Sequence, residues 1–203
     1  MKNIQYILIY FLVYSCSNEF QTISNNTKDC NEKYSELINK VDSIKNTENY
    51  MLLYKMIDSV RLCKDFKNDV TRLKLNLMVE AKDSKNGLKF LDSLKDSSFL
   101  FYREKKEMLK NYFLFLEDSS NILLLKVSRD KLIKRLVYYC DSRNKIILEE
   151  IIHDILFINS LYMKRDMFKN SINELSKKCL KLESFTNELG NDIYSEKYEI
   201  IYD

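Results

Sequence analysis

The chain has 203 residues, of which 45% are hydrophobic and 31% charged, a composition typical of a folded globular protein and not of a disordered one. Its formal net charge is only +3, so the overall charge does not indicate a nucleic acid as partner. With no proline and only two glycines, the chain lacks the turn residues of β-sandwiches and barrels and the glycine series of phosphate-binding loops, which favours an all-α fold.

The beginning of the chain has the layout of a secretory signal. A single early cation, Lys2, precedes an apolar run from Tyr6 to Tyr14, and the small residue Ser15 comes directly before Cys16. The apolar run is too short to span a bilayer as a helix. We therefore expect this segment to direct export of the protein.

The same segment resembles a bacterial lipoprotein signal. In that family an aliphatic residue lies three positions before an obligatory cysteine, and a small residue lies directly before it, as Val13, Ser15 and Cys16 do here. The resemblance implies that residues 1–15 are a signal peptide and that lipid on Cys16 holds the protein at the membrane. Plain secretion, with Cys16 an ordinary thiol, and an N-terminus without a targeting role are the two alternatives.

The residues after the cysteine bear on where the protein faces. Some bacterial lipoproteins carry a run of acidic residues there as a surface-export signal, whereas this chain has only Glu19. The resemblance thus implies a lipid-anchored protein of the cell envelope, at the outer membrane and facing the periplasm. Residues 16–31 are polar and aperiodic, and we expect them to form a tether before a single all-helical domain at 32–203.

The domain shows repeated helical periodicity, in which apolar residues recur at three- and four-residue spacing. Polar breaks made of Asp, Ser, Asn and Lys separate these windows and favour caps and turns. The predicted helices cover residues 32–45, 47–63, 66–81, 87–95, 99–116, 121–140, 144–163 and 166–184. Short connections predict antiparallel helical hairpins, which form either a degenerate repeat solenoid or an irregular helical bundle.

One stretch resembles a tetratricopeptide-type helical repeat. Its positions recur after a shift of 34 residues: Leu75, Met78, Gly87, Leu91 and Leu94 are followed by Leu109, Tyr112, Asn121, Leu125 and Ser128. The resemblance implies stacked helix-turn-helix units and a surface for binding a protein. An irregular bundle is the alternative, because pairs of apolar helices match such spacing by chance.

The sequence offers few residues for catalysis. The single histidine, His153, lies in an apolar helical window, where we interpret it as a packing residue. Glu150 and Asp154, one helical turn apart, are interpreted as exposed helix charges. No motif for a nucleophile, a metal or a cofactor is present, so we expect a protein without enzymatic activity, metal or cofactor.

Four further cysteines, Cys30, Cys63, Cys140 and Cys179, follow Cys16. None belongs to a C-x-x-C pair, which argues against a zinc ribbon or a thioredoxin-like motif. In an oxidising compartment they allow three complete pairings that the sequence cannot rank. Buried thiols are the alternative for the last three, because each continues an apolar stripe.

A basic cluster is the candidate partner-binding site. It consists of Lys126, Arg129, Lys131, Lys134 and Arg135. The cluster suits an acidic protein or anionic lipid headgroups, and the solvated face of an amphipathic helix is the alternative. We therefore expect a membrane-anchored, non-catalytic protein-interaction module, and alternatively an envelope immunity or inhibitor protein that neutralises a toxin or effector.

Overall fold

The computed structural model describes residues 26–94, 102–141 and 144–198. Within these ranges the chain forms nine α-helices and three short 3₁₀-helices, and it contains no strand. The expected all-α fold is confirmed. Its physical basis is the helical periodicity of the apolar residues combined with breaks that use polar caps in place of proline.

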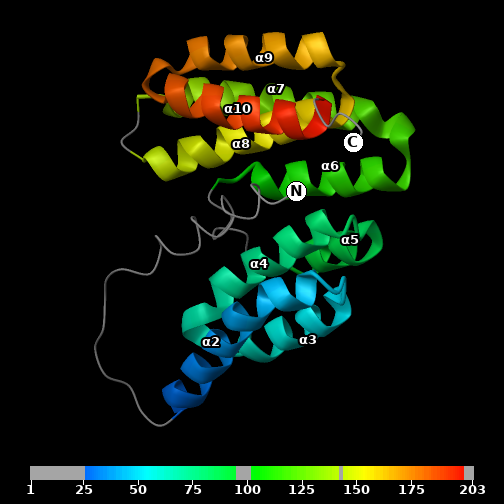
Figure 1. Cartoon of the computed structure of the whole chain (residues 1–203), viewed down its shortest axis with the longest axis vertical. Coiled ribbons are helices and arrows are strands. Elements are labelled where there is room, and N and C mark those ends of the chain that lie inside the picture. The colour runs from blue at the N-terminus through cyan, green and yellow to red at the C-terminus, as the bar shows by residue number, and fades with distance from the viewer. Residues whose placement is uncertain (1–25, 95–101, 142–143, 199–203) are drawn as a thin grey trace.

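The lower part of the molecule in Figure 1 consists of the first helices of the chain. These are α2 (Asn26–Lys45), α3 (Tyr50–Val60), η1 (Lys64–Phe66), α4 (Lys67–Glu80) and α5 (Ser84–Ser93). Short polar side chains start two of them: Asn49 accepts a hydrogen bond from the backbone N–H of Leu52, and Asp83 accepts one from that of Asn86.

The upper part contains the remaining helices (Figure 1). These are α6 (Lys105–Glu117), η2 (Ser119–Asn121), α7 (Ile122–Tyr139), α8 (Lys145–Tyr162), α9 (Arg165–Lys178), η3 (Leu180–Leu182) and α10 (Glu183–Tyr198). Asn144 caps α8 by accepting from the backbone N–H of Ile147. Each helix packs against the next along the chain, so the fold is a succession of antiparallel hairpins.

Helices two places apart along the chain also touch. The Lys45 ammonium of α2 lies 2.8 Å from a Glu80 carboxylate oxygen of α4, and the Tyr112 hydroxyl of α6 donates to the Val79 carbonyl of α4 at 3.2 Å. The Tyr112 ring also packs edge-on against Phe157 of α8, and α8 in turn packs against α10. These contacts arrange the even-numbered helices as one layer of a two-layer stack.

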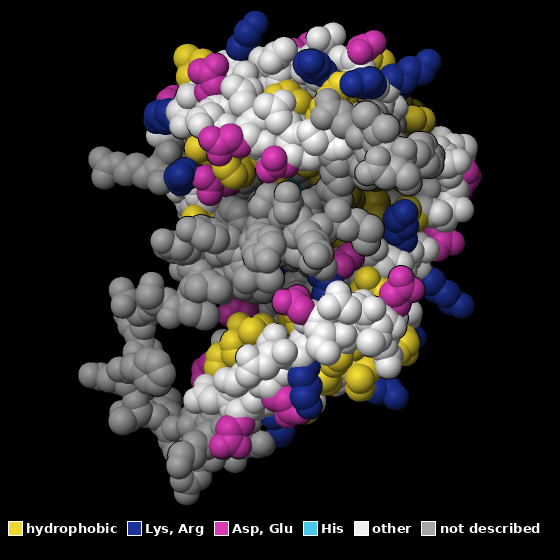
Figure 2. Space-filling model, viewed as in Figure 1, with side chains coloured by type: hydrophobic (Ala, Val, Ile, Leu, Met, Phe, Trp, Pro, Cys, Tyr) yellow, Lys and Arg dark blue, Asp and Glu magenta, His cyan; other side chains and the backbone are white. Residues whose placement is uncertain are grey.

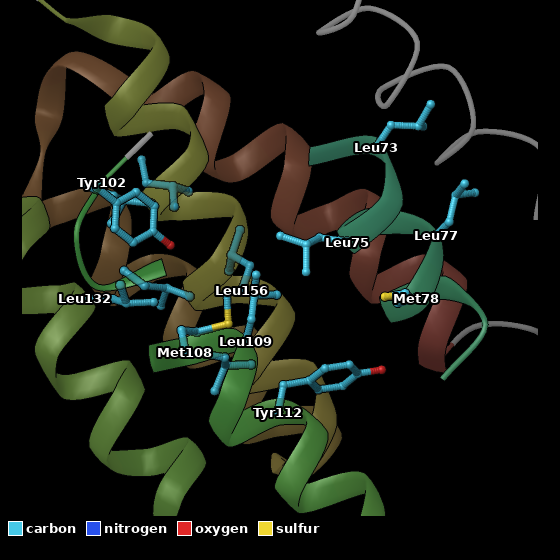
Figure 3. Close-up of a cluster of buried hydrophobic side chains, with 14 of the residues drawn as sticks. Leu73, Leu75, Leu77, Met78, Tyr102, Met108, Leu109, Tyr112, Leu132 and Leu156 are labelled. Carbon is cyan, nitrogen blue, oxygen red and sulfur yellow. The ribbon is translucent and has the colours of Figure 1, made fainter. Parts of the chain in front are cut away.

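A single hydrophobic core runs through both parts of the molecule. In Figure 3, Leu75 of α4 points toward Met108 and Leu109 of α6 and Leu156 of α8. All four side chains are buried, and burial of apolar surface is the main favourable contribution to folding. This contact therefore joins the lower helices to the upper ones.

The positions that recur after 34 residues fall on two successive hairpins. The first set lies on α4 and α5, with Leu94 directly after α5, and the second lies on α6, η2 and α7. Every member is buried except Asn121, which is half-buried. The spacing in the sequence thus corresponds to equivalent buried positions on neighbouring hairpins.

Several expected boundaries differ from the structure. The helix expected at 87–95 spans Ser84–Ser93, and residues 102–104, expected to lie in a helix at 99–116, precede α6, which begins at Lys105. The first described helix begins at Asn26, so residues 26–31, expected to belong to the tether, are helical. A disulfide between Cys30 and Cys63, with a Cα–Cα distance of 5.9 Å, ties this extension to the chain after α3. We did not expect Cys30 to be part of the helical body, because polar residues surround it in the sequence.

The prediction of one helix at 166–184 is wrong. In the structure α9 ends at Lys178, Cys179 leaves the helical conformation with φ −144° and ψ 84°, and the chain continues through η3 into α10. Leu182, expected to lie in the same helix, therefore lies in η3. No glycine, proline or asparagine marks this break, and residues 185–198 were left without a predicted helix.

Candidate interaction surface

The expected lipidation site, Cys16, lies outside the described residues. Among the helices that the structure does describe, none is both long enough and apolar enough to cross a membrane. The structure therefore bears on the other candidate site, the basic cluster, all of whose residues lie on α7.

The inward face of α7 explains how this helix is held. Leu125, Ser128, Leu132 and Leu136 are buried and recur at three- and four-residue spacing, so they form one stripe toward the core. The Asn111 side chain of α6 donates to the Ser128 hydroxyl at 2.8 Å. This face fixes the rotation of the helix and determines which residues point outward.

The outward face of α7 carries large apolar side chains in contact with solvent. Leu123 is 67% exposed and Tyr138 is 74% exposed, and Val127 and Val137 are also exposed. These residues lie opposite the buried stripe, at the two ends of the helix. Isolated exposed apolar residues are common, but four on one face of one helix make this face the candidate contact surface. We call Leu123, Lys126, Val127, Lys134, Val137 and Tyr138 the α7 face.

Arg129 does not belong to this face, because it is used inside the molecule. Its Nε donates to the Asn159 side-chain oxygen of α8 at 2.9 Å, and its guanidinium approaches Glu174 of α9 at 3.9 Å. Asn159 is fully buried and donates onward to the Ser171 hydroxyl of α9 at 3.2 Å. Arg129 thus links α7, α8 and α9, and its role is structural.

Two more cations of the cluster are paired with α6 or the residue before it. Lys131 lies 2.5 Å from a Glu107 carboxylate oxygen, and Arg135 lies 3.4 Å from Glu104. The Arg135 guanidinium also lies over the Tyr139 ring, 4.4 Å from its centroid. The five cations are therefore not one uniform patch, because three of them already have acidic partners.

Lys126 and Lys134 remain on the outside. Both are exposed, and no carboxylate in the described ranges lies within ion-pair distance of either. Lys126 has only an aromatic neighbour, with its ammonium 5.9 Å from the Tyr162 ring centroid. These two lysines and the four apolar side chains make up the surface that is available to a partner.

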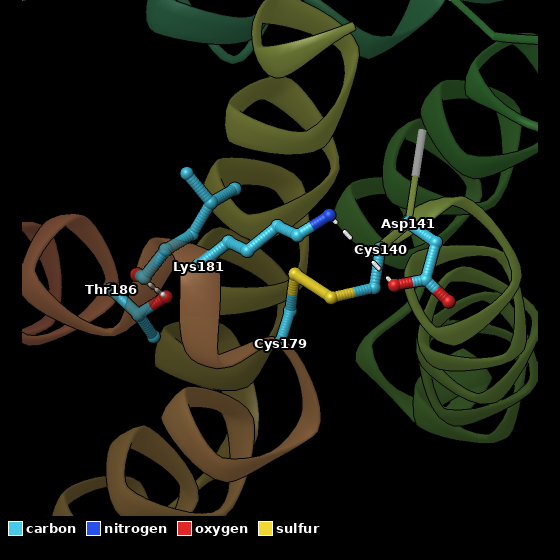
Figure 4. The surroundings of a disulfide bond; sticks show 6 residues. Cys140, Asp141, Cys179, Lys181 and Thr186 are labelled. Carbon is cyan, nitrogen blue, oxygen red and sulfur yellow. Dashed lines mark hydrogen bonds and ion pairs between the residues drawn. A yellow bond between two sulfur atoms is a disulfide. The ribbon is translucent and has the colours of Figure 1, made fainter. Parts of the chain in front are cut away.

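A disulfide holds the C-terminal end of this surface. Cys140, directly after α7, is bonded to Cys179, directly after α9, with a Cα–Cα distance of 5.5 Å (Figure 4). Beside it the Lys181 ammonium lies 3.8 Å from Asp141. Leu180, next to the disulfide, is 69% exposed. The end of α7 is therefore covalently fixed to its neighbour.

A second polar cluster lies inside the molecule, where α6 meets α8. The Lys105 side chain contacts carboxylate oxygens of both Glu150 and Asp154, and the Tyr102 hydroxyl donates to Asp154. Lys105 is 7% exposed and Asp154 is 3% exposed. The interpretation of Glu150 and Asp154 as exposed helix charges is therefore wrong: Asp154 is buried, Glu150 is partly buried, and both pair with α6.

The protonation of this cluster follows from its contacts. Burial acts to lower the pKa of Lys105, but the Asp154 and Glu150 carboxylates outweigh it and raise that pKa above its usual value. Burial acts to raise the pKa of Asp154, but the Lys105 ammonium and His153 outweigh it and hold that pKa low. Burial, followed by the Asp154 charge, raises the pKa of Tyr102. Lys105 is thus a buried cation whose partners keep it charged.

His153 lies at the edge of the same cluster. Its Nδ1 atom is 3.5 Å from an Asp154 carboxylate oxygen, while its side chain is partly exposed. Lys105 of α6 and Tyr102, which precedes α6, also bind the Asp154 carboxylate. These contacts join the start of α6 to α8. In the described part of the chain, no group of three His, Cys, Asp or Glu residues is placed to hold a metal ion.

Figure 2 shows cationic and anionic side chains interspersed over the face that it presents, without a large area of one sign. Sequence reasoning missed the apolar members of the α7 face. Apolar residues occur on both the buried and the exposed side of this helix, so their spacing does not show which of them contact solvent. Sequence reasoning also missed Lys105, although this residue continues the buried stripe of Met108, Leu109 and Tyr112.

The chain was compared with models of protein families, with curated proteins and with solved structures, and no match was found in any of the three.

Proposed function

We propose that this protein is a lipid-anchored, non-catalytic protein-interaction module of the bacterial cell envelope. Lipid on Cys16 holds it at the outer membrane, facing the periplasm, and the polar residues after the cysteine give reach. The helical body then presents the α7 face to a protein partner. The observation that carries the proposal is this exposed apolar and cationic face on a covalently braced helical stack.

The two disulfides support the assignment to the envelope. Cys30 pairs with Cys63 and Cys140 with Cys179, so all four described cysteines are oxidised. Disulfides persist in oxidising compartments such as the bacterial periplasm and are rare in the cytosol. The pairing fits the export signal that the sequence predicts at residues 1–15.

The architecture supports a role in binding. Neighbouring antiparallel hairpins with equivalent buried positions 34 residues apart fit the proposed likeness to tetratricopeptide-type repeats. Stacks of this kind create extended surfaces from the side chains of successive helices. Here Arg129, Lys131 and Arg135 tie α7 to neighbouring elements, so the outward face is held in place before a partner arrives.

Capture of partners from an extract of the source cells' envelope tests the proposal. The full chain, bearing a C-terminal affinity tag, is compared with a Leu123→Asp/Tyr138→Asp variant. A Leu62→Asp variant is the matched control, because Leu62 is 89% exposed and lies at the end of α3, away from α7. We expect a protein that is retained by the wild type and the control and lost by the α7 variant.

The identity of the retained protein distinguishes the two kinds of interaction module. A set of resident envelope proteins indicates an assembly role, whereas one foreign toxin or effector bound tightly indicates an immunity protein, for which unpaired cations would speed association. Equal retention by all three variants would remove the α7 face from the proposal.

A further inference from the structure

The apolar and cationic residues of the α7 face follow a fixed order along the helix, and this order limits the ligands that the face can bind. Leu123 and Val127 occupy the first turns of the helix, and Val137 and Tyr138 occupy the last turn. Lys134 lies between the two apolar ends, and Lys126 lies beside the first one. From Leu123 to Tyr138 the face is about 22 Å long, since an α-helix rises 1.5 Å per residue.

The charge of the face is positive once internal pairs are set aside. Asp130 is exposed and lies one helical turn from each of the two lysines, and its carboxylate lies 3.3 Å from the guanidinium of Arg129, so the lysines and Asp130 together leave an excess of one positive charge. Lys126 and Lys134 lack a carboxylate partner among the residues that the structure describes, as shown above. A ligand with negative charge between its apolar contacts therefore complements Lys126 and Lys134 better than a basic one.

We propose that the α7 face binds an acidic amphipathic helix of a partner protein. The partner helix has about four turns, with apolar side chains at both ends and Asp or Glu residues between them. Its ends pack on Leu123 with Val127 and on Val137 with Tyr138. Its carboxylates pair with Lys126 and Lys134. This inference rests on the proposed function and specifies the partner's chemistry.

Two other occupants fit the same face less well. A second copy of the chain, related by two-fold symmetry, would place the same cations opposite each other, because such an interface pairs identical surfaces. An anionic membrane attracts each nearby lysine by about 1 kcal/mol, and recognition normally takes four to eight basic residues, whereas this face has two unpaired ones.

The disulfide beside the face supports a rigid ligand over a flexible one. Cys140 follows Tyr138 by two residues, and its bond to Cys179 fixes the last turn of α7 relative to α9. Side chains that are fixed on α7 bind with the smallest loss of entropy to a partner whose side chains are also fixed, as they are along a helix.

A direct binding measurement tests this inference. The probe is a fluorescent synthetic peptide of about 18 residues, long enough for four turns and with its ends covalently stapled to fix the helix. It carries leucines at both ends of one face and glutamates between them. A control peptide has the same leucines with lysines in place of the glutamates. Binding to the full chain in mild detergent is followed by fluorescence anisotropy at low and high salt.

The expected result is binding of the acidic peptide, weakened by salt, and no binding of the basic peptide. Lys126→Glu/Lys134→Glu should weaken the affinity about tenfold or more, because it replaces two attractions with two repulsions. Lys55→Glu/Lys85→Glu is the matched control, since both lysines are exposed on other helices, and it should change affinity less than twofold by the same reasoning. Unchanged circular dichroism shows that each variant is folded.

Three results would overturn the inference: no binding of the acidic peptide, equal binding of both peptides, or equal binding by the lysine variants. Flotation of the detergent-free Cys16→Ala chain with anionic vesicles, abolished by Lys126→Glu/Lys134→Glu, would assign the face to the membrane instead. The proposed function is separable from this outcome. If capture from the extract depends on Leu123 and Tyr138 while the acidic peptide does not bind, the interaction module stands and its partner has a different chemistry.

Discussion

Gly87 of α5 lies so close to the ring of Phe113 of α6 that a β-carbon at position 87 would come within 2.4 Å of the Phe113 Cζ atom. Phe113 is fully buried, so its ring has no open space into which to move. The chain's other glycine, Gly190 of α10, meets Ile172 of α9 in the same way, at 2.7 Å. Both glycines thus lie where a side chain of the neighbouring helix packs directly against the helix backbone.

The first prediction is that Gly87→Ala destabilises the protein. Alanine favours the helix by about 1 kcal/mol over glycine, but forcing an extra carbon into a packed core costs about 1–3 kcal/mol. We expect a net loss of up to about 2 kcal/mol by these figures, measured by urea unfolding. Asn76→Ala, at an exposed position in the middle of α4, is the control and should be neutral or stabilising.

A double variant separates the clash from other effects. Trimming the ring with Phe113→Leu should destabilise the wild type more than it destabilises the Gly87→Ala protein, because the two changes share one contact. If the two losses simply add, the close approach of Gly87 to Phe113 is not what limits position 87.

Lys105→Met is the second prediction, and we expect it to be strongly destabilising. The substitution keeps the length of the side chain but leaves Asp154 buried and Glu150 partly buried without their cation. Breaking a buried ion pair in this way costs about 3–5 kcal/mol. Thermal unfolding provides the measurement.

The triple variant Lys105→Met/Glu150→Gln/Asp154→Asn should recover much of this stability, because it removes the stranded charges as well. No recovery would mean that the carboxylates are not the origin of the loss.

The third prediction concerns alkaline pH. The pKa of Lys105 and the pKa of Tyr102 are both raised in the folded protein, so folding favours the protonated form of each group. Their contribution is complete below the ordinary values of 10.5 and 10.0 and is lost as pH rises through the raised ones. Melting temperatures measured between about pH 8 and about pH 11 should fall more steeply for the wild type than for Lys105→Met/Tyr102→Phe. Parallel curves would contradict this assignment.

On the acid side the sign is opposite. The pKa of Asp154 is held below its ordinary value of 3.8, so its contribution is present above that value and is lost as pH falls through the lowered pKa. Asp154→Asn should therefore remove part of the loss of stability at low pH, which a pH series of unfolding curves measures.

The sequence was sufficient for the fold class and for most helices, because apolar periodicity and polar caps are local signals. It was insufficient at Cys179, where a helix ends without a turn residue, and at Cys30, whose partner is 33 positions away. Lys105 shows the same limit: a lysine in an apolar stripe is a visible anomaly, but its carboxylates come from α8. The spacing of residues along one helix does not predict which side chains of another helix will contact it.

The candidate surface was likewise only partly predictable. The basic residues of α7 were found from the sequence, yet Arg129 and Arg135 point to neighbouring helices and only Lys126 and Lys134 stay unpaired within the described ranges. Which side of α7 faces the core depends on the packing of Leu132 and its neighbours, and that is set by tertiary structure.

The fourth prediction is that the two disulfides stabilise the fold. Cys140→Ser/Cys179→Ser opens a cross-link between residues 39 positions apart, and loops of this length correspond to about 4 kcal/mol in the chain-entropy treatment. Peptide mapping without reductant should recover the Cys30–Cys63 and Cys140–Cys179 pairs. The variant should melt at a lower temperature and bind the acidic peptide more weakly, because the last turn of α7 is no longer fixed. Any other pairing would contradict the structure at this end of α7.

The last prediction concerns the anchor, and its motivation is the apolar run and small residue before Cys16. Cys16→Ala should abolish labelling with a fatty-acid analogue and move the protein from the membrane fraction to the soluble fraction, since none of the described helices is a candidate membrane span. Its circular dichroism should stay helical, because the described helices begin at Asn26, ten residues after the substitution. Cys30→Ser/Cys63→Ser is the matched cysteine control and should keep the label. If the Ala variant stayed in the membrane and resisted salt and carbonate washing, an uncleaved signal anchor would replace the lipoprotein assignment.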